Sequence, residues 1–145
     1  GAARSVALAL ARAGVEEVAV VNRTEQRARR AVALLGDRGR VVAPAEVPEA
    51  VRSAELVVNA TPIGMGRPGP DDLPVDPGLL RAGQVVVDLV YQPIETPLLA
   101  AAGARGAVAV NGLPMLVHQA AVAFRLWTGV EAPVAAMTAA VRASI

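Results

Sequence analysis

Two arginines follow the apolar run that ends at Val20-Val21, and their placement points to a specific chemistry. The chain continues Asn22-Arg23-Thr24, and Arg27 lies one helical turn beyond Arg23. At the end of the second strand of a dinucleotide-binding sheet, Asp or Glu usually accepts a hydrogen bond from a ribose 2′-hydroxyl, whereas Arg pairs with a 2′-phosphate. A guanidinium can bond two phosphate oxygens at once and stays charged. The segment therefore predicts an NADP site. An ordinary helix capped by Thr24, with solvated arginines, fits the same residues.

A second polar segment, Asn59-Ala60-Thr61, follows the apolar residues 56–58. In parallel sheets the ligand crevice lies beyond the carboxyl ends of the strands, so Asn59 and Thr61 can bond ribose or phosphate groups there, and Gly64 permits close approach of the backbone. The alternative is a strand end stabilised by side-chain turn bonds.

A third strand end, Asp88-Leu89-Val90-Tyr91, places an aromatic residue with a polar tip on the same rim. We interpret Asp88 as a structural carboxylate that holds nearby backbone rather than as a base, because no His stands beside it in the sequence.

A helix predicted over residues 112–128 carries Gly112, Met115 and Gln119 on one stripe, which Val122 and Leu126 continue as an apolar face. An amide near the start of such a face predicts a ligand contact, or else a buried Gln that a backbone group satisfies.

Three other side chains of this helix are predicted to have structural roles rather than to bind a ligand or a metal. His118 points elsewhere and has no acidic or Cys partner nearby in the sequence, so it is predicted to be a surface or packing residue rather than a metal ligand. Phe124 and Trp127 are predicted to lie in the core.

Composition narrows the class of protein. The 145 residues have a net charge of +1 and 54% hydrophobic content, which predicts one globular domain and argues against nucleic-acid binding by charge. Cysteine is absent, which fits a cytoplasmic protein, and no run of eighteen uncharged apolar residues or signal-peptide pattern favours a membrane or secretory role. All basic residues are arginine, so the chain offers no lysine for catalysis.

Short β-branched runs alternate with alanine-rich helical stretches, which is typical of βαβ units. We expect an α/β, Rossmann-like, doubly wound parallel sheet with helices on both faces. The predicted strands are 18–22, 40–43, 55–59, 84–88 and 107–110, and the predicted helices are 3–13, 24–35, 46–52, 96–104, 112–128 and 133–143. Residues 61–83 form a long Pro- and Gly-rich connection, which we expect to be functional or mobile.

The first predicted helix follows Gly1-Ala2 with no strand before it. In a doubly wound fold with strand order 3-2-1-4-5-6, the first strand and its glycine turn precede that helix. We therefore expect residues 1–145 to be a dinucleotide-binding domain that is truncated at its N-terminus, with its first strand missing and its two sheet halves left unpaired there.

Together the motifs Gly-Ala-Ala-Arg, Asn-Arg-Thr-x-x-Arg, Asn-Ala-Thr-Pro-Ile-Gly-Met, Val-Asp-Leu-Val-Tyr and Asn-Gly-x-x-Met-Leu-Val-x-Gln resemble, in this order, the cofactor domain of shikimate dehydrogenase. The resemblance implies a 2′-phosphate site at Asn22, Arg23, Thr24 and Arg27. It implies that Asn59, Ala60, Thr61, Leu89 and Gly112 line the adenine-ribose and nicotinamide side, with Met115 near the nicotinamide. Gly1 and Ala2 would end a phosphate-binding glycine loop, and Tyr91 and Gln119 would reach shikimate.

The resemblance further implies reversible NADPH-dependent reduction of 3-dehydroshikimate to shikimate, in chorismate and aromatic amino acid biosynthesis. A lysine and an aspartate from an N-terminal substrate domain assist that reaction in the family. No segment here matches that domain, so no catalytic residue is assigned and the chain alone is expected to be inactive; a homodimer is a further expectation. The alternatives are a quinate/shikimate dehydrogenase paralogue, glutamyl-tRNA reductase, which the Tyr91 and Gly112–Gln119 patterns do not favour, and a non-catalytic NADP-binding module.

Overall fold

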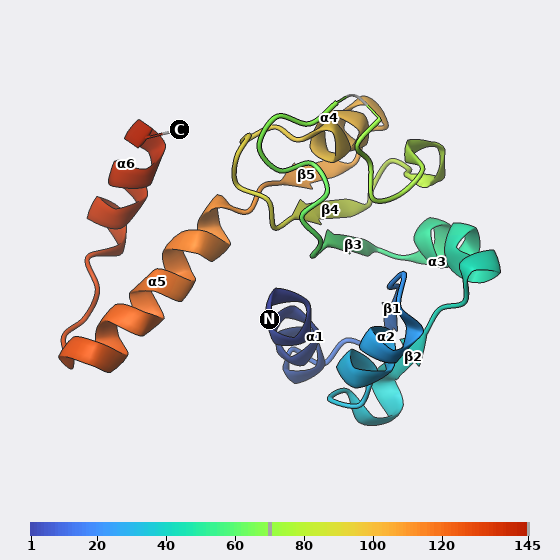
Figure 1. Ribbon diagram of the computed structural model, residues 1–145, viewed down its shortest axis with the longest axis horizontal. Helices are drawn as coiled ribbons and strands as arrows, with labels where there is room; N and C mark the ends of the chain where they lie inside the picture. The colour runs from blue at the N-terminus through green and yellow to red at the C-terminus, as the bar shows by residue number, and fades with distance from the viewer. Residues whose placement is uncertain (70, 145) are drawn as a thin grey trace. The chain divides into compact units, whose positions relative to one another are not determined.

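The computed structural model describes residues 1–69 and 71–144, and the chain divides into two compact units, Gly1–Ala54 and Glu55–Ile145. Each unit contains its own parallel sheet with flanking helices, and we describe each by itself (Figure 1).

The first unit holds a two-stranded parallel sheet. Its main elements are α1 (Ala2–Arg12), β1 (Val18–Val20), α2 (Glu25–Val32), β2 (Gly39–Val41) and α3 (Val47–Ser53), with short 3-10 helices η1 (Gly36–Arg38) and η2 (Pro44–Glu46). In the register of the sheet, Val18 lies opposite Gly39 and Val20 opposite Val41. The buried residues come mainly from α1, α2 and the segments that follow α2 and β2: Ala7, Ala28, Ala31, Leu35 and Val42.

The ends of two helices in this unit differ in how well the sequence predicts them. Gly14 has φ +86° just after α1, in the left-handed region that a helix terminus favours in glycine, and this agrees with the predicted end. The helix predicted to reach residue 35 ends at Val32 instead. The N–H groups of Leu34 and Leu35 bond carbonyls three residues back, so the chain tightens and leaves the α-helix before Gly36.

The second unit is built on the three-stranded parallel sheet β3-β4-β5. Its elements are β3 (Leu56–Asn59), the 3-10 helix η3 (Pro77–Leu79), β4 (Val85–Asp88), α4 (Pro97–Ala104), β5 (Val108–Val110), α5 (Leu113–Thr128) and α6 (Val134–Ser144). Helix α4 packs on β4 and β5 and supplies much of the core, because Leu98, Leu99 and Ala102 are buried with Val86 of β4. Thr96 and Pro97 begin α4 as predicted, since the Thr96 hydroxyl accepts a hydrogen bond from the Leu99 N–H at 3.3 Å.

The structure confirms all five predicted strands and all six predicted helices, with small shifts at their ends. The described residues form two separate parallel sheets, β1-β2 and β3-β4-β5, which agrees with the expectation that the two sheet halves are not paired with each other. Within each sheet the strands are parallel and helices connect them, as in a Rossmann-like fold. Helices α1–α6 include none long and apolar enough to cross a membrane.

Candidate functional site

In the first unit, the residues predicted to hold a 2′-phosphate lie in the turn between β1 and α2 and in the first turn of α2. Asn22, Arg23, Thr24 and Arg27 are all exposed. The Asn22 Oδ1 accepts a hydrogen bond from the Thr24 N–H at 2.9 Å, which shapes this turn. Thr24 occupies the N-cap position of α2, but its side chain makes no capping bond, so the prediction that it caps the helix holds for its position and not for its hydroxyl.

Neither Arg23 nor Arg27 has a recorded ion pair or side-chain hydrogen bond within residues 1–69 and 71–144, in contrast to the arginines that follow them at positions 29 and 38. Arg29 instead pairs with Glu25 at 2.6 Å, and the Arg38 guanidinium donates to the Val15 carbonyl. The guanidinium groups of Arg23 and Arg27 are therefore available to an anion.

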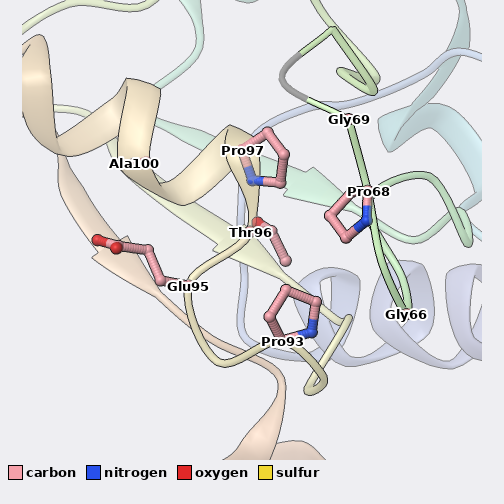
Figure 2. A pocket seen from close by; sticks show the side chains of 8 residues that line it. All are labelled: Gly66, Pro68, Gly69, Pro93, Glu95, Thr96, Pro97 and Ala100. Atoms are coloured by element: carbon pink, nitrogen blue, oxygen red, sulfur yellow. The ribbon is translucent and has the colours of Figure 1, made fainter.

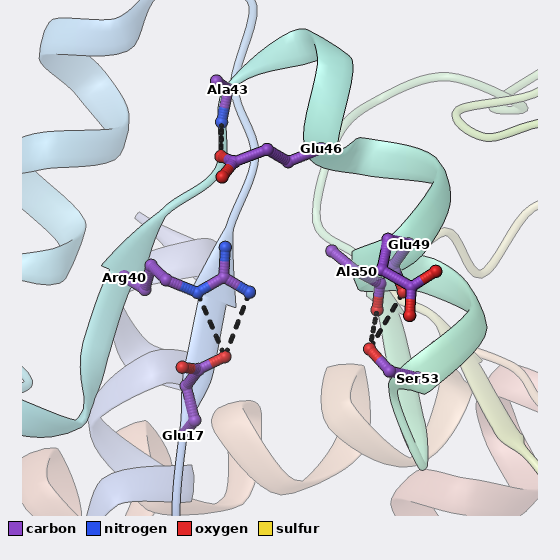
Figure 3. Close-up of polar contacts among 7 residues, drawn as sticks. All are labelled: Glu17, Arg40, Ala43, Glu46, Glu49, Ala50 and Ser53. Carbon is purple, nitrogen blue, oxygen red and sulfur yellow. Dashed lines mark hydrogen bonds and ion pairs between the residues drawn. The ribbon is translucent and has the colours of Figure 1, made fainter.

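Figure 3 shows Arg40 of β2 donating two hydrogen bonds to Glu17, at 3.1 and 3.2 Å. The hydrogen bond to Glu17 raises the pKa of the Arg40 guanidinium. The same view shows Glu46 accepting from the Ala43 N–H at 2.9 Å, which fixes the turn from β2 into η2. These contacts order the sheet edge without engaging Arg23 or Arg27.

In the second unit, polar side chains meet where β3 and β4 end. Asn59 and Asp88 are register partners at the carboxyl ends of the two strands, and both are buried. The Asn59 Nδ2 donates to Asp88 Oδ1 at 2.9 Å and to the Ile63 carbonyl at 3.1 Å. The Asn59 Oδ1 accepts from the N–H and the hydroxyl of Thr61, at 3.0 and 2.7 Å.

This bonding uses every hydrogen-bonding position of the Asn59 amide, which has two donors and two acceptor lone pairs. The Asn59 side chain therefore supports the site and has no group left for a ligand, as in the alternative of a strand end stabilised by turn bonds. The Thr61 hydroxyl donates to Asn59 and accepts from the Ile63 N–H at 3.2 Å, so one of its lone pairs stays open on an exposed residue. Ala60 lies half-buried beside it.

Asp88 is a structural carboxylate, as the sequence predicts. Its Oδ1 accepts from the Val90 N–H at 3.0 Å as well as from Asn59, and its Oδ2 accepts from the Thr96 hydroxyl at 2.7 Å. The sequence did not assign Thr96 to the site. Its only signal was the Thr-Pro pair that begins a helix, which does not show that the hydroxyl also reaches a carboxylate eight residues earlier.

Leu89 and Gly112 bring the end of β4 against the start of α5. The Leu89 N–H bonds the Asn59 carbonyl at 3.0 Å, and the Gly112 N–H bonds the Val90 carbonyl at 3.1 Å. A Cβ at Gly112 would lie 2.2 Å from the Leu89 carbonyl oxygen and 2.5 Å from its carbon. Gly112 is therefore required for the close approach of two backbone segments, a reason independent of any ligand.

The residues predicted to reach the nicotinamide and the substrate are more exposed to solvent than Asn59 and Asp88. Tyr91 is 39% exposed, Met115 is half-buried and Gln119 is exposed. The Gln119 Nε2 donates to the Leu116 carbonyl of its own helix at 3.2 Å, so Gln119 is not the buried amide that the alternative interpretation describes. His118 is exposed, as predicted.

The prediction that Trp127 lies in the core is wrong, because its side chain is 85% exposed; Phe124 is half-buried. Val122 and Leu126 are also exposed, at 53% and 75%. Among the helices and strands, α5 packs chiefly on α6. The apolar periodicity of α5 was correctly identified, but periodicity does not show what covers the face.

Gly1 precedes α1 and Ala2 is its first residue. The N–H groups of Arg4 and Ser5 bond the Gly1 carbonyl at 3.1 and 3.3 Å, so Gly1 starts the helix as its N-cap. Their predicted place at the end of a phosphate-binding loop stays a prediction.

Two hollows lie in the second unit. One, of about 520 Å³, is bounded by the loops before α4 and after β3 and by α4 itself; its lining residues are Gly66, Pro68, Gly69, Pro93, Glu95, Thr96, Pro97 and Ala100. Figure 2 shows its proline rings around Thr96, with the Glu95 side chain directed away from them. The other, of about 350 Å³, lies between α5 and α6 and is lined in part by Gln119, Phe124 and Trp127. No cluster of three or more potential metal ligands occurs within the described parts of the chain.

Parallel sheets with intervening helices, and polar residues gathered at the carboxyl ends of the strands, define the class of NAD(P)-binding Rossmann-like domains. The model of the shikimate 5'-dehydrogenase C-terminal domain matches residues 112–142. The chain is 45% identical over 149 residues to the NADP(+) shikimate dehydrogenase of Moorella thermoacetica, with 98% of this chain and 50% of that protein covered.

Solved structures agree with this relationship. A quinate dehydrogenase from Corynebacterium glutamicum in complex with NAD matches with TM-score 0.87 and 36% identity, covering 95% of this chain and 50% of that one. A shikimate 5-dehydrogenase from Thermus thermophilus in complex with NADP(H) and shikimate matches with TM-score 0.81 and 40% identity, covering 97% and 51%. Over nearly its whole length the chain is similar to shikimate dehydrogenases, and it spans about half the length of the curated relatives it matches.

Proposed function

We propose that this chain is the NADP-binding part of a shikimate dehydrogenase, which reduces 3-dehydroshikimate reversibly to shikimate in chorismate biosynthesis. The observation that carries the cofactor assignment is the pair of exposed arginines after β1, Arg23 and Arg27, to which no carboxylate is bound in the described residues. An acidic residue at this place would repel a 2′-phosphate, whereas two guanidinium groups attract it.

The residues present fit the cofactor in each unit. Asn22 shapes the turn that presents Arg23, and Thr24 lies beside it at the start of α2. In the second unit Ala60, the open lone pair of Thr61, and the backbone around Leu89 and Gly112 would line the nicotinamide side, with Met115 next to them. When bound, NADPH supplies a hydride to the substrate carbonyl carbon, and a proton completes the alcohol.

The substrate role is proposed for Tyr91 and Gln119, whose polar tips lie on exposed side chains of the second unit. The acid-base pair is proposed to come from an N-terminal substrate domain, because this chain contains no lysine. We also propose a cytoplasmic homodimer; light scattering of the purified protein tests the oligomeric state.

The experiment is a coupled measurement of turnover and cofactor affinity on the full-length protein. Shikimate-dependent reduction of NADP is compared with that of NAD, and the NADP dissociation constant is measured for the wild type, Arg23→Ala and Arg29→Ala. Arg29 is the matched control, since it lies on α2, the helix that follows the turn with Arg23, and is paired with Glu25. We expect Arg23→Ala to raise the NADP dissociation constant by about 10- to 100-fold, because charge-assisted hydrogen bonds to the phosphate are lost. Arg29→Ala should change this constant less than about twofold.

A quinate/shikimate dehydrogenase that uses NAD is the second candidate, and the similarity to the quinate dehydrogenase bound to NAD is the observation in its favour. Faster turnover of quinate with NAD than of shikimate with NADP would select it. NADP binding without turnover of either substrate would instead select a non-catalytic module.

A further inference from the structure

The buried Asp88 connects three segments that are distant in the sequence. Its carboxylate is fully buried and accepts hydrogen bonds from Asn59 after β3, from the Val90 N–H after β4, and from Thr96 at the start of α4. All three recorded donors are neutral groups. A carboxylate that is removed from water is costly unless such donors replace the lost hydration, so its position depends on all three segments staying in place.

The loop between two of these anchors carries Tyr91. It starts at Val90, whose N–H bonds Asp88, and it ends at Thr96, whose hydroxyl bonds the other oxygen of the same carboxylate. The loop also bonds the segment after β3, because the Gly66 N–H donates to the Gln92 carbonyl at 2.9 Å. Both ends of the Tyr91 loop are therefore fixed to one side chain.

The same carboxylate holds the loop after β3 through Asn59. Because the Asn59 amide is fully bonded, a change at Asp88 would free its Nδ2 and disturb the bonds to Ile63 and Thr61 as well. Buried polar networks of this kind give a single geometry when every member is satisfied, and they lose it when one member is removed.

We propose that Asp88 and Thr96 are positioning residues that fix Tyr91 for substrate binding. This inference rests on the proposed function only for the identity of the substrate that Tyr91 contacts. Neither residue touches the substrate; each acts through the backbone of the Tyr91 loop.

The test uses four substitutions in the full-length protein. Thr96→Val keeps the shape of the side chain and removes the hydroxyl, Thr96→Ser keeps the hydroxyl, and Thr138→Val is the matched control on α6, where the hydroxyl donates to the Val134 carbonyl of its own helix. The tyrosine rings are labelled with ¹³C, and the signal that disappears in Tyr91→Phe is assigned to Tyr91, the single tyrosine of residues 1–145.

We expect Thr96→Val to broaden or split the Tyr91 signal, while Thr96→Ser and Thr138→Val keep the wild-type signal. In turnover assays, Thr96→Val is expected to raise KM for shikimate about tenfold and to change kcat much less. A tenfold rise corresponds to the loss of one buried hydrogen bond. In a Tyr91→Phe background the same substitution should raise KM less than about twofold, because coupled residues are not additive.

An unchanged Tyr91 signal in Thr96→Val, or an equal rise of KM with and without the tyrosine hydroxyl, would overturn the positioning role. Absence of shikimate turnover in the wild type would instead refute the proposed function. The tyrosine spectrum would still decide whether the hydrogen bond between Thr96 and Asp88 positions Tyr91, since it needs no substrate.

Discussion

Replacing Gly112 with alanine is the most direct test of how the end of β4 meets the start of α5. The added Cβ would lie 2.2 Å from the Leu89 carbonyl oxygen and 2.9 Å from the Val90 carbonyl oxygen. Both neighbours are backbone atoms, so no side chain can rotate away, and the two segments must separate by about 1 Å to reach ordinary van der Waals contact. That movement breaks the 3.1 Å bond from the Gly112 N–H to the Val90 carbonyl.

The magnitude follows from these two effects. Overpacking of this kind costs about 1–3 kcal/mol, and a lost hydrogen bond costs about 1 kcal/mol. We therefore expect Gly112→Ala to lower the free energy of unfolding by about 2–4 kcal/mol, which corresponds to a fall in Tm of about 5–15 °C for a domain of this size.

The control for Gly112→Ala is Gly103→Ala in α4, because a Cβ there would meet nothing within 4 Å. Alanine in a helix interior is favoured over glycine, so this variant should gain about 0.5–1 kcal/mol. Both are measured by thermal and urea unfolding followed by circular dichroism. If Gly112→Ala unfolds within about 1 °C of the wild type, the inferred close approach of Gly112 to Leu89 is wrong.

Three further predictions follow from single contacts. Arg23→Asp should lower the preference for NADP over NAD by about 100-fold or more, because a carboxylate repels the 2′-phosphate and can accept from a 2′-hydroxyl; titration with both cofactors measures this, and a retained preference would remove Arg23 from the site. Thr96→Val should lower the free energy of unfolding by about 1–2 kcal/mol, because the helix α4 loses its N-cap bond and Asp88 loses a donor. Thr96→Ser keeps the hydroxyl and should lose less than half as much stability, measured by urea unfolding. Equal losses in the two variants would show that the hydroxyl contributes little. Trp127→Ala in residues 1–145 should change the free energy of unfolding by less than about 0.5 kcal/mol, because the indole is 85% exposed; a loss above 2 kcal/mol would contradict its exposure.

The secondary structure could be predicted because each element carries a local signal. Valine-rich runs gave β3 and β4, the Thr96-Pro97 pair gave the start of α4, and Gly14 gave the end of α1. The early end of α2 carried no such signal, since residues 33–35 are good helix formers and the departure depends on how the chain turns toward β2.

The candidate site was predicted less completely, because its contacts join segments far apart in the sequence. Asn59 and Asp88 meet only through the register of β3 and β4, which no local pattern reveals. Val122 and Leu126 show the converse error: a helical apolar stripe indicates that a face can be buried, and the structure leaves these two side chains of α5 exposed.

The hydrogen bonds of the second unit separate the residues that build the site from those that can bind a ligand. The Asn59 amide and the Asp88 carboxylate are held inside the protein, and Gly112 is fixed by backbone that leaves no room for a side chain. The groups left open are the Thr61 lone pair, the Tyr91 side chain, and Arg23 and Arg27 of the first unit. Because the supporting residues are buried and the open ones are exposed, substitutions at Asp88 or Gly112 should change stability together with affinity. Substitutions at Arg23 should change cofactor affinity alone, and this contrast distinguishes a built binding site from a set of exposed polar residues.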